Sequence, residues 1–433
     1  METMTYKKIR PIENRQLVLC FQIHQPNRLR KIDTLKGGDP QLLDEDLDRE
    51  IMQRVSKACY IPTNTMILRL IDQYPQIKIA FSISGIALEQ MELYAPEALE
   101  SFKRLADTGA VDFISETYYH SLSFLLESDE FEIQILEHAE KLIEHFGVHT
   151  SVFRNAHLIY NDDIGRRLAM MGFQGVLTEG CDRALRHYRP HTLYEHRDQN
   201  GLKLFFRNTR LSDDIAFRAP NPEWHLTADQ YALWLDTMPD NEKLVTVCLD
   251  YETFGEHHKP ETGIFHFLEH LLLLISIQNT TKMATPTEIA RSYEAERAIA
   301  IPDYVAVAGT DLSDWVGNEL QRHAFSEMVA LESAIKNKND AVLIKLWRRL
   351  QSSDHFYYMS DRAYCQNCVS PYSSAQMAHD CYMKIIDFIR QQITQFDLET
   401  DSSKLNEAME SERRNPQTPL WVTQVEGRHE WHT

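Results

Sequence analysis

The sequence of 433 residues predicts an α/β fold whose parallel strands close into a barrel, followed by a helical domain. Three observations lead to this prediction. Short apolar runs recur up to about residue 252, most of them separated by segments with helical periodicity. The runs are almost continuous in apolar residues, which is typical of strands covered on both faces in a parallel sheet. After residue 310 the helical periodicity continues, but strand-like runs almost disappear.

Seven apolar runs are the expected strands, and their number favours a barrel over a small open sheet. The intervening helices have recognisable ends. In segment 128–147 the apolar residues fall on one helical face, and Gly147 stands where a C-cap is expected. Segment 161–172 begins with Asn161 and Asp162, which favour helix N-termini. The expected strands are residues 17–23, 77–84, 111–115, 151–155, 175–179, 202–208 and 243–252.

Changes in pattern divide the chain into three parts. Residues 1–310 contain the alternation of strands and helices and form the expected barrel domain. Residues 311–397 have helical periodicity throughout, and we expect a helical domain there. Residues 398–433 are polar, and we expect a loosely attached C-terminal tail.

Composition narrows the classes of function. The net charge of −19 leaves no basic surface for nucleic acid. No apolar run reaches the length of a membrane span, and the first residues lack the apolar core of a signal peptide. The seven cysteines are scattered, which fits a reducing compartment. We therefore expect a cytoplasmic protein without nucleic-acid or membrane partners, whose oligomeric state the sequence does not indicate.

Polar side chains follow the expected strands at the ends where parallel barrels carry their active sites. Any one of them could be a loop residue or a helix cap. Together they form a ring of carboxylates, imidazoles and guanidinium groups, which suits acid–base chemistry on a polar substrate. The residues of this ring are His24, Gln25, Glu116, His120, Arg154, Asn155, His157, Glu179, Arg207, Asp250 and Glu252.

Six segments occur in a fixed order, which is more specific than any single motif. They are FQIHQPNRL, ISETYYHSLSFL, VFRNAHLIYND, LDYETFGEHHKPETGIFHFL, DLSDWVGNELQ and SDHFYYM, between residue 21 and about residue 359. With these segments the sequence resembles the α-amylase group of glycoside hydrolase family 57. The resemblance implies an incomplete (β/α)7 barrel, a helical domain that closes over the site, and a retaining mechanism on α-1,4-linked glucans without a metal or another cofactor.

Retaining glycosidases use two carboxyl groups, one as a nucleophile and one as an acid/base. The resemblance implies that Asp250, in LDYETFG, is the acid/base. It also implies a nucleophile on the fourth strand, where the family usually reads Phe-Arg-Asn-Thr-Glu-Leu-Ile-Tyr and this sequence reads FRNAHLIY. His157 therefore stands at the position of the catalytic glutamate, and Ala156 replaces the threonine before it.

A histidine does not supply the negative charge that stabilises an oxocarbenium-like transition state. We therefore expect a protein that binds α-1,4-glucans or maltooligosaccharides and whose hydrolysis is absent or impaired. The alternative is an active retaining hydrolase that uses His157, or a displaced carboxylate from Glu116, Glu179 or Glu252. A metal-dependent polysaccharide deacetylase on a similar barrel is disfavoured, because its ligand motif is missing near the strand ends.

The resemblance also implies that Trp315 and His355 line the sugar cleft, together with polar residues of the ring. We expect His24, Glu116, Asp250 and His355 to converge in one cleft. The expected substrate-binding residues are His24, Gln25, Glu116, His120, Arg154, Glu252, Trp315 and His355.

Two short motifs point to metals but are incomplete. The segment from His266 to His270 matches a zinc-protease pattern, but no third ligand can be assigned. Cys365 and Cys368 form a lone Cys-x-x-Cys pair, which supplies only half of a structural zinc site. We expect free loop thiols there and no metal site.

Overall fold

The computed structural model describes residues 10–31, 42–199, 201–219, 226–364 and 370–414. Seven parallel strands follow one another around a ring in the order β1, β2, β3, β4, β5, β7, β8. This arrangement confirms the predicted barrel fold. The strands are β1 (Arg15–Ile23), β2 (Ile79–Ile83), β3 (Val111–Phe113), β4 (Val152–Arg154), β5 (Gly175–Glu179), β7 (Lys203–Arg207) and β8 (Leu244–Asp250).

The ring is joined weakly at two places. Between β3 and β4 the contact is the bridge between Ser115 and Phe153, just beyond the end of β3. Between β7 and β8 the register contains one pair, Arg207 with Thr246. Three further strands lie beside the ring: β6 (Tyr194–His196), β9 (Thr281–Met283) and β10 (Arg297–Ile299).

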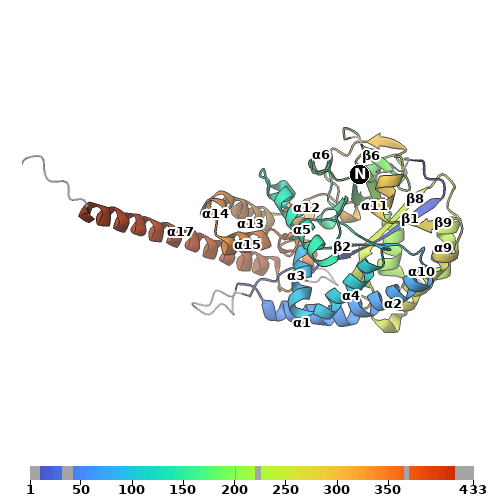
Figure 1. Ribbon diagram of the computed structural model, residues 1–433, viewed down its shortest axis with the longest axis horizontal. Helices are drawn as coiled ribbons and strands as arrows, with labels where there is room; N and C mark the ends of the chain where they lie inside the picture. Colours follow the sequence, from blue (N-terminus) through green and yellow to red (C-terminus); the bar gives the residue numbers. More distant parts are fainter. Residues whose placement is uncertain (1–9, 32–41, 200, 220–225, 365–369, 415–433) are drawn as a thin grey trace, which may run out of the picture.

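Alternate residues of each strand face the barrel interior and the surrounding helices. In β1, Val18 and Cys20 belong to the interior group, whereas Leu17 and Leu19 pack outward against the helical layer. This alternation is expected for a strand, and burial on both faces explains why the strands are nearly continuous in apolar residues. Helices α1, α2, α4 and α10 cover one side of the barrel (Figure 1).

The helices of the barrel domain end as the sequence indicates. Helix α5 runs over Glu130–Phe146 and stops at Gly147, whose φ of 66° is the left-handed conformation of a C-cap. Helix α6 begins after Asn161, whose side chain accepts a hydrogen bond from the backbone N–H of Ile164. The others are α1 (Glu45–Val55), α2 (Ile61–Gln73), α3 (Gly85–Tyr94), α4 (Pro96–Asp107), α7 (Asp182–Leu185), α8 (Thr209–Asp213), α9 (Ala228–Asp236), α10 (Ile264–Ile277) and α11 (Pro286–Ser292).

Helices alone make up the C-terminal part that the structure describes. They are α12 (Ser313–Val316), α13 (Glu319–Ala330), α14 (Glu332–Lys338), α15 (Ala341–Leu350), α16 (Ser353–Tyr357) and α17 (Ala375–Arg414). Helices α13, α14 and α15 pack along α17, whose far end extends away from the body (Figure 1). The indole of the buried Trp347 ties α15 to α13 by donating to the carbonyl of Met328 at 2.9 Å.

The division expected at residue 398 falls inside helix α17, which continues to Arg414. The rest of the expected tail, residues 415–433, and the Cys365–Cys368 pair lie outside the described residues. Among the helices that are described, none combines the length and apolar character needed to span a membrane.

A turn after β8 packs tightly against the π-helical turn Ser56–Tyr60 that precedes α2. Gly255 in this turn has φ of 110°, and a Cβ atom there would overlap the carbonyl oxygen of Ala58. Gly263, eight residues later, has φ of 79° but no neighbouring atom within 4 Å of such a Cβ. Substitutions at the two glycines therefore distinguish the cost of backbone strain, common to both, from the cost of steric overlap, which applies to Gly255.

We predict that Gly255→Ala destabilises the protein more than Gly263→Ala. Both variants carry the left-handed backbone cost of about 1–2 kcal/mol. Only Gly255→Ala adds the cost of overpacking, about 1–3 kcal/mol. Urea unfolding of the two variants and the wild type measures the difference. Equal destabilisation would contradict the close approach of this turn to Ala58.

Candidate active site

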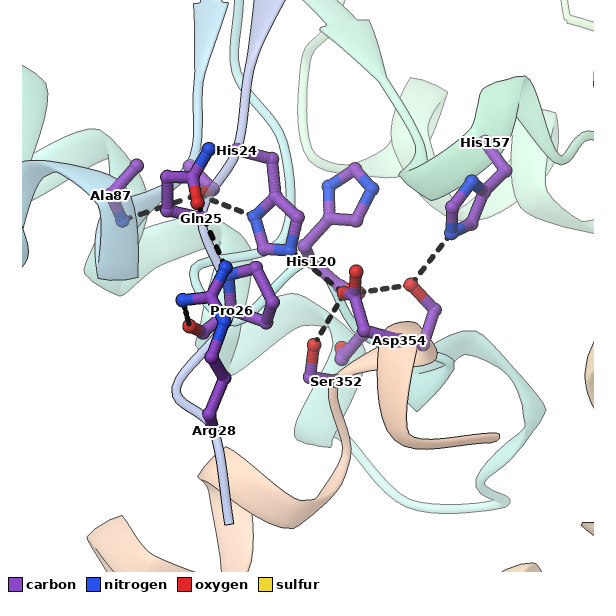
Figure 2. A network of polar contacts seen from close by, with 12 residues as sticks. His24, Gln25, Pro26, Arg28, Ala87, His120, His157, Ser352 and Asp354 are labelled. Carbon is purple, nitrogen blue, oxygen red and sulfur yellow. Dashed lines mark hydrogen bonds and ion pairs between the residues drawn. The ribbon is translucent and has the colours of Figure 1, made fainter. Parts of the chain in front are cut away.

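Three imidazoles stand side by side at the barrel mouth (Figure 2). His24 follows β1, His120 follows β3 and His157 follows β4. The rings of His24 and His120 are stacked, with centroids 4.1 Å apart, and those of His120 and His157 meet edge to face at 5.0 Å. The carboxyl ends of parallel strands meet at one edge, which brings these residues together from distant parts of the chain.

A chain of hydrogen bonds runs through the His120 ring at the mouth. Arg154 Nη2 donates to Gln22 Oε1, and Gln22 Nε2 lies 3.1 Å from His120 Nε2. His120 Nδ1 lies 2.7 Å from Glu116 Oε2. Because the Gln22 amide nitrogen only donates, His120 Nε2 accepts and its proton is on Nδ1. The chain therefore fixes a neutral tautomer of His120, and burial, followed by the nearby charge of His24, holds the pKa of His120 well below its usual value.

Glu116 is completely buried, with 0% exposure, and both its carboxylate oxygens and its backbone N–H are bonded. Its Oε1 accepts from the hydroxyl of Ser82 at 2.8 Å, and its backbone N–H donates to Nδ1 of His138 at 3.1 Å. His138 Nε2 in turn lies 2.7 Å from the carbonyl of Ile83. Glu116 is therefore part of the supporting network, and its carboxylate has no surface exposed to a substrate.

His157 occupies a strained turn. Its φ of 52° and the φ of 58° at Leu158 are both left-handed, which is uncommon for residues with a Cβ. The imidazole Nε2 lies 2.8 Å from the hydroxyl of Ser353, and its ring packs 4.6 Å from Trp315. Ser353 gives its hydroxyl proton to the carbonyl of His120 at 2.9 Å, so His157 Nε2 is the donor in the first contact. Burial, and then His120, hold the pKa of His157 well below its usual value, so the ring is neutral.

The helical domain contributes a carboxylate that the sequence reasoning missed. Asp354 Oδ2 lies 2.8 Å from His24 Nε2 and accepts from the hydroxyl of Ser352 at 2.9 Å (Figure 2). Burial acts to raise the pKa of Asp354, but His24 outweighs it and holds this pKa well below its usual range. The neighbouring His355, a predicted substrate-binding residue, packs with its ring 6.0 Å from that of Tyr382 inside the helical domain. In the sequence, the Ser-Ser-Asp segment at the start of α16 is the feature that could have indicated this carboxylate.

Two carboxyl groups at the end of β8 have opposite environments. Asp250 is exposed and lies opposite Gln22 in the register of β8 with β1. Glu252 is 6% exposed, and its Oε1 accepts from the hydroxyl of Tyr60 at 2.5 Å and from Gln25 Nε2 at 3.5 Å. Burial, and then the charge of Asp250, raise the pKa of Glu252 to about 8. At neutral pH Glu252 therefore retains its proton.

The carboxylate of Glu179 belongs to an ion pair at the ends of β5 and β7. It accepts from Arg207 Nη1 at 3.2 Å and from the hydroxyl of Thr209 at 2.6 Å. Arg207 also binds Asp213 at 2.6 Å. These contacts close the barrel beside the mouth and leave Glu179 fully buried.

A set of side chains spaced for a metal ion lies away from the mouth in the described part of the chain. It consists of Glu92, Glu144 and His145. Lys141 Nζ already lies 2.9 Å from the carboxylate of Glu92 and 3.1 Å from that of Glu144. A cation of the protein therefore occupies the position that a metal would need.

The proton on Glu252 gives a prediction for stability. A folded-state pKa near 8, above the usual 4.5, means that this proton is lost from the unfolded chain first as pH rises. The contribution of this proton to the free energy of unfolding is complete below pH 4.5. It falls by up to about 5 kcal/mol as the pH rises to 8. Glu252→Gln mimics the protonated acid and should remove most of this fall.

Urea unfolding at pH 5 and pH 8 measures the effect. The control is Glu256→Gln on the same turn, where the carboxylate pairs with Arg54 at 2.9 Å. We expect this control to keep the pH dependence of the wild type. An unchanged pH dependence in Glu252→Gln would show that Glu252 is ionised in the folded protein.

Comparisons with known proteins agree with this fold. The sequence pattern described as Glycosyl hydrolase family 57 matches residues 18–302. A protein of Methanocaldococcus jannaschii named "Putative alpha-amylase" is 37% identical over 372 residues, which is 82% of this chain and 79% of that protein.

Solved structures show the same fold. A family 57 branching enzyme from Thermococcus kodakaraensis matches with a TM-score of 0.67 and 13% identity over 88% of this chain and 91% of that chain. A branching enzyme from Pyrococcus horikoshii matches with a TM-score of 0.65 and 14% identity, over 85% and 88%. A 4-alpha-glucanotransferase from Thermococcus litoralis matches with a TM-score of 0.61 and 14% identity. The match covers 79% of this chain and 56% of the glucanotransferase chain. The chain belongs to glycosyl hydrolase family 57.

Proposed function

We propose that this family 57 protein binds α-1,4-glucans at the barrel mouth and hydrolyses them slowly or not at all. The proposal rests on His157, a neutral imidazole at the position where the family pattern has its nucleophilic glutamate. A retaining glycosidase needs a carboxylate there to attack the anomeric carbon and to stabilise positive charge. The contact with Ser353 and the packing on Trp315 hold this imidazole in place.

The surrounding carboxyl groups support impaired hydrolysis. Both oxygens of Glu116 are bonded to Ser82 and His120, and both oxygens of Glu179 are bonded as well. Glu252 is protonated at neutral pH and therefore lacks the charge of a nucleophile. Because Glu116 and Glu179 are 0% exposed and Glu252 is protonated, none of the three carboxylates of the alternative mechanism is an exposed, ionised group.

Glucan binding is supported by what the mouth still contains. The acid/base candidate Asp250 is exposed to solvent, and His24 and His157 are only partly buried. Trp315 is 2% exposed, and its ring packs 4.6 Å from that of His157, so it supports this imidazole at the mouth from behind. The names of the relatives, an alpha-amylase, branching enzymes and a glucanotransferase, agree with an α-glucan as the ligand. We also propose that residues 311–397 act as the cover of this site and that the protein works in the cytoplasm.

Asp354 favours a second candidate, an active hydrolase. It is ionised, it lies at the mouth beside His24, and one of its oxygens, Oδ2, takes both of its hydrogen bonds. In such an enzyme Asp354 would take the place of the missing nucleophile. The catalytic experiment below separates the two candidates.

We predict saturable binding of maltoheptaose in titration calorimetry. Trp315→Ala should weaken the affinity about two- to tenfold, because it removes the aromatic contact, of a kind that contributes about 0.5–1.5 kcal/mol, that holds His157 in place. Trp234→Ala, which removes a partly buried tryptophan of α9, is the control and should leave the affinity unchanged. The absence of heat with every α-glucan would contradict the proposed function.

We predict that restoring the family residues restores hydrolysis. The double variant Ala156→Thr/His157→Glu should release reducing sugar from maltoheptaose at least about a hundredfold faster than the wild type, because it regains a nucleophile. Adding Asp250→Asn should abolish the gain. The matched control is Ala156→Thr/His157→Gln, which has the same size without the charge.

The rate of hydrolysis by the wild type in the same assay distinguishes impaired hydrolysis from an active hydrolase that uses Asp354. Hydrolysis at an ordinary enzymatic rate that is lost in Asp354→Asn, but kept in His157→Ala, would show that the nucleophile has moved to the helical domain. The proposal of impaired hydrolysis would then be wrong.

A further inference from the structure

Two cysteines lie side by side inside the barrel, one layer below the mouth. Cys20 of β1 and Cys248 of β8 are partners in the parallel register of these strands. Neighbouring strands are about 4.8 Å apart, so the two Cα atoms are close. Both side chains belong to the interior group with Val152 and Leu177, and they are 0% and 3% exposed.

The pair lies directly under residues of the candidate site. Side chains two positions apart on a strand point the same way, so Cys20 lies under Gln22 and Cys248 under Asp250. Gln22 and Asp250 are themselves partners in the register. Any movement of β1 against β8 at the thiols is therefore passed on to the residues at the mouth.

Positive charge surrounds this pair. Arg154 is 3% exposed, and its Nε and Nη1 have no hydrogen-bond partner among the described residues. Arg207 Nε donates to the carbonyl of Cys248 at 2.7 Å. A hydrogen bond from Cys20 lowers the pKa of Cys248 most, burial opposes it, and the two arginines add to the lowering, to about 7.

A buried cysteine often serves only as a small apolar residue. That explanation accounts for Cys59, which is buried and donates to the carbonyl of Tyr251 at 3.0 Å. It does not account for a buried guanidinium with two unbonded N–H groups beside two thiols. Such a cation stabilises a thiolate, and a thiolate next to a thiol is the arrangement from which disulfides form.

We propose that Cys20 and Cys248 are a redox-active pair that closes to a disulfide on reaction with a peroxide. The Cys248 thiolate attacks one peroxide oxygen, the O–O bond breaks, and a sulfenic acid and hydroxide form. The sulfur of Cys20 then displaces the sulfenic hydroxyl, and its proton goes to the leaving oxygen. In total, two thiols and hydrogen peroxide give one disulfide and two waters, and the two sulfurs supply the two electrons.

Closing this bond moves the strands. A disulfide needs Cα atoms 4.4–6.8 Å apart, which the strand spacing satisfies, but its Cβ atoms are about 3.8 Å apart. That separation is smaller than the strand spacing of about 4.8 Å, so β1 and β8 are drawn together below Gln22 and Asp250. We infer that oxidation lowers the affinity for α-glucan, an effect that rests on the proposed function.

Peptide mapping of the full chain tests the disulfide. After treatment with hydrogen peroxide and alkylation, a digest without reduction should contain a peptide that links Cys20 to Cys248. The thiol count in denaturant should fall from seven to five and return with dithiothreitol. Cys20→Ala and Cys248→Ala should each abolish the link, whereas Cys181→Ala, which removes a half-exposed thiol, should not.

Two results would overturn the proposal. One is that Cys20 and Cys248 remain alkylatable while Cys181 is oxidised. The other is that the link forms only after the protein is unfolded in urea. Either result would mean that the two thiols are packing residues of the barrel.

Calorimetry with maltoheptaose tests the consequence. The oxidised wild type should bind at least about threefold more weakly than the reduced protein, and dithiothreitol should restore the affinity. Cys20→Ala should bind equally before and after peroxide. If the reduced protein binds no glucan, the proposed function is contradicted but the disulfide is not. If the reduced protein binds glucan but forms no Cys20–Cys248 link after peroxide treatment, only the redox inference is contradicted.

Discussion

A carboxylate that is fully removed from water must have every oxygen bonded, and Glu116 imposes this requirement on the barrel mouth. Its two oxygens bind Ser82 and His120, and the tautomer of His120 is then set by Gln22. Gln22 in turn orients Arg154. One buried charge thus fixes side chains on four neighbouring segments, because a partly bonded network in a low dielectric would be costly.

The same mouth depends on the helical domain. Asp354 and Ser353 reach His24 and His157 from α16, and the backbone N–H of Ser353 donates to the carbonyl of His120 at 3.1 Å. The imidazoles are therefore held from both sides, by strands below and by a helix above. Removing the helical contacts would leave two partly buried imidazoles with unpaired ring nitrogens, so the site and the domain arrangement are stabilised together.

The sequence was sufficient for the barrel because its signals are local. Strand burial, the C-cap at Gly147 and the N-cap at Asn161 depend on neighbouring residues, and strand ends of parallel barrels converge by topology. The contacts of Asp354 and Tyr60 were not predictable in this way. Asp354 meets His24 across 330 positions of the chain, and Tyr60 meets Glu252 across 192. The proton on Glu252 follows from burial, which no pattern of residue types specifies.

Helix α17 has a consequence for how the molecule moves through water. Its 40 residues span about 60 Å at 1.5 Å per residue, and its far end stands away from the body (Figure 1). A compact chain of 433 residues has a radius of gyration of only about 22 Å. A rod of this length adds friction out of proportion to its mass, so rotation about the rod's axis is faster than end-over-end tumbling. The apparent molecular mass obtained from size-exclusion elution or from diffusion, which treats the molecule as a sphere, would therefore exceed the true mass of the chain.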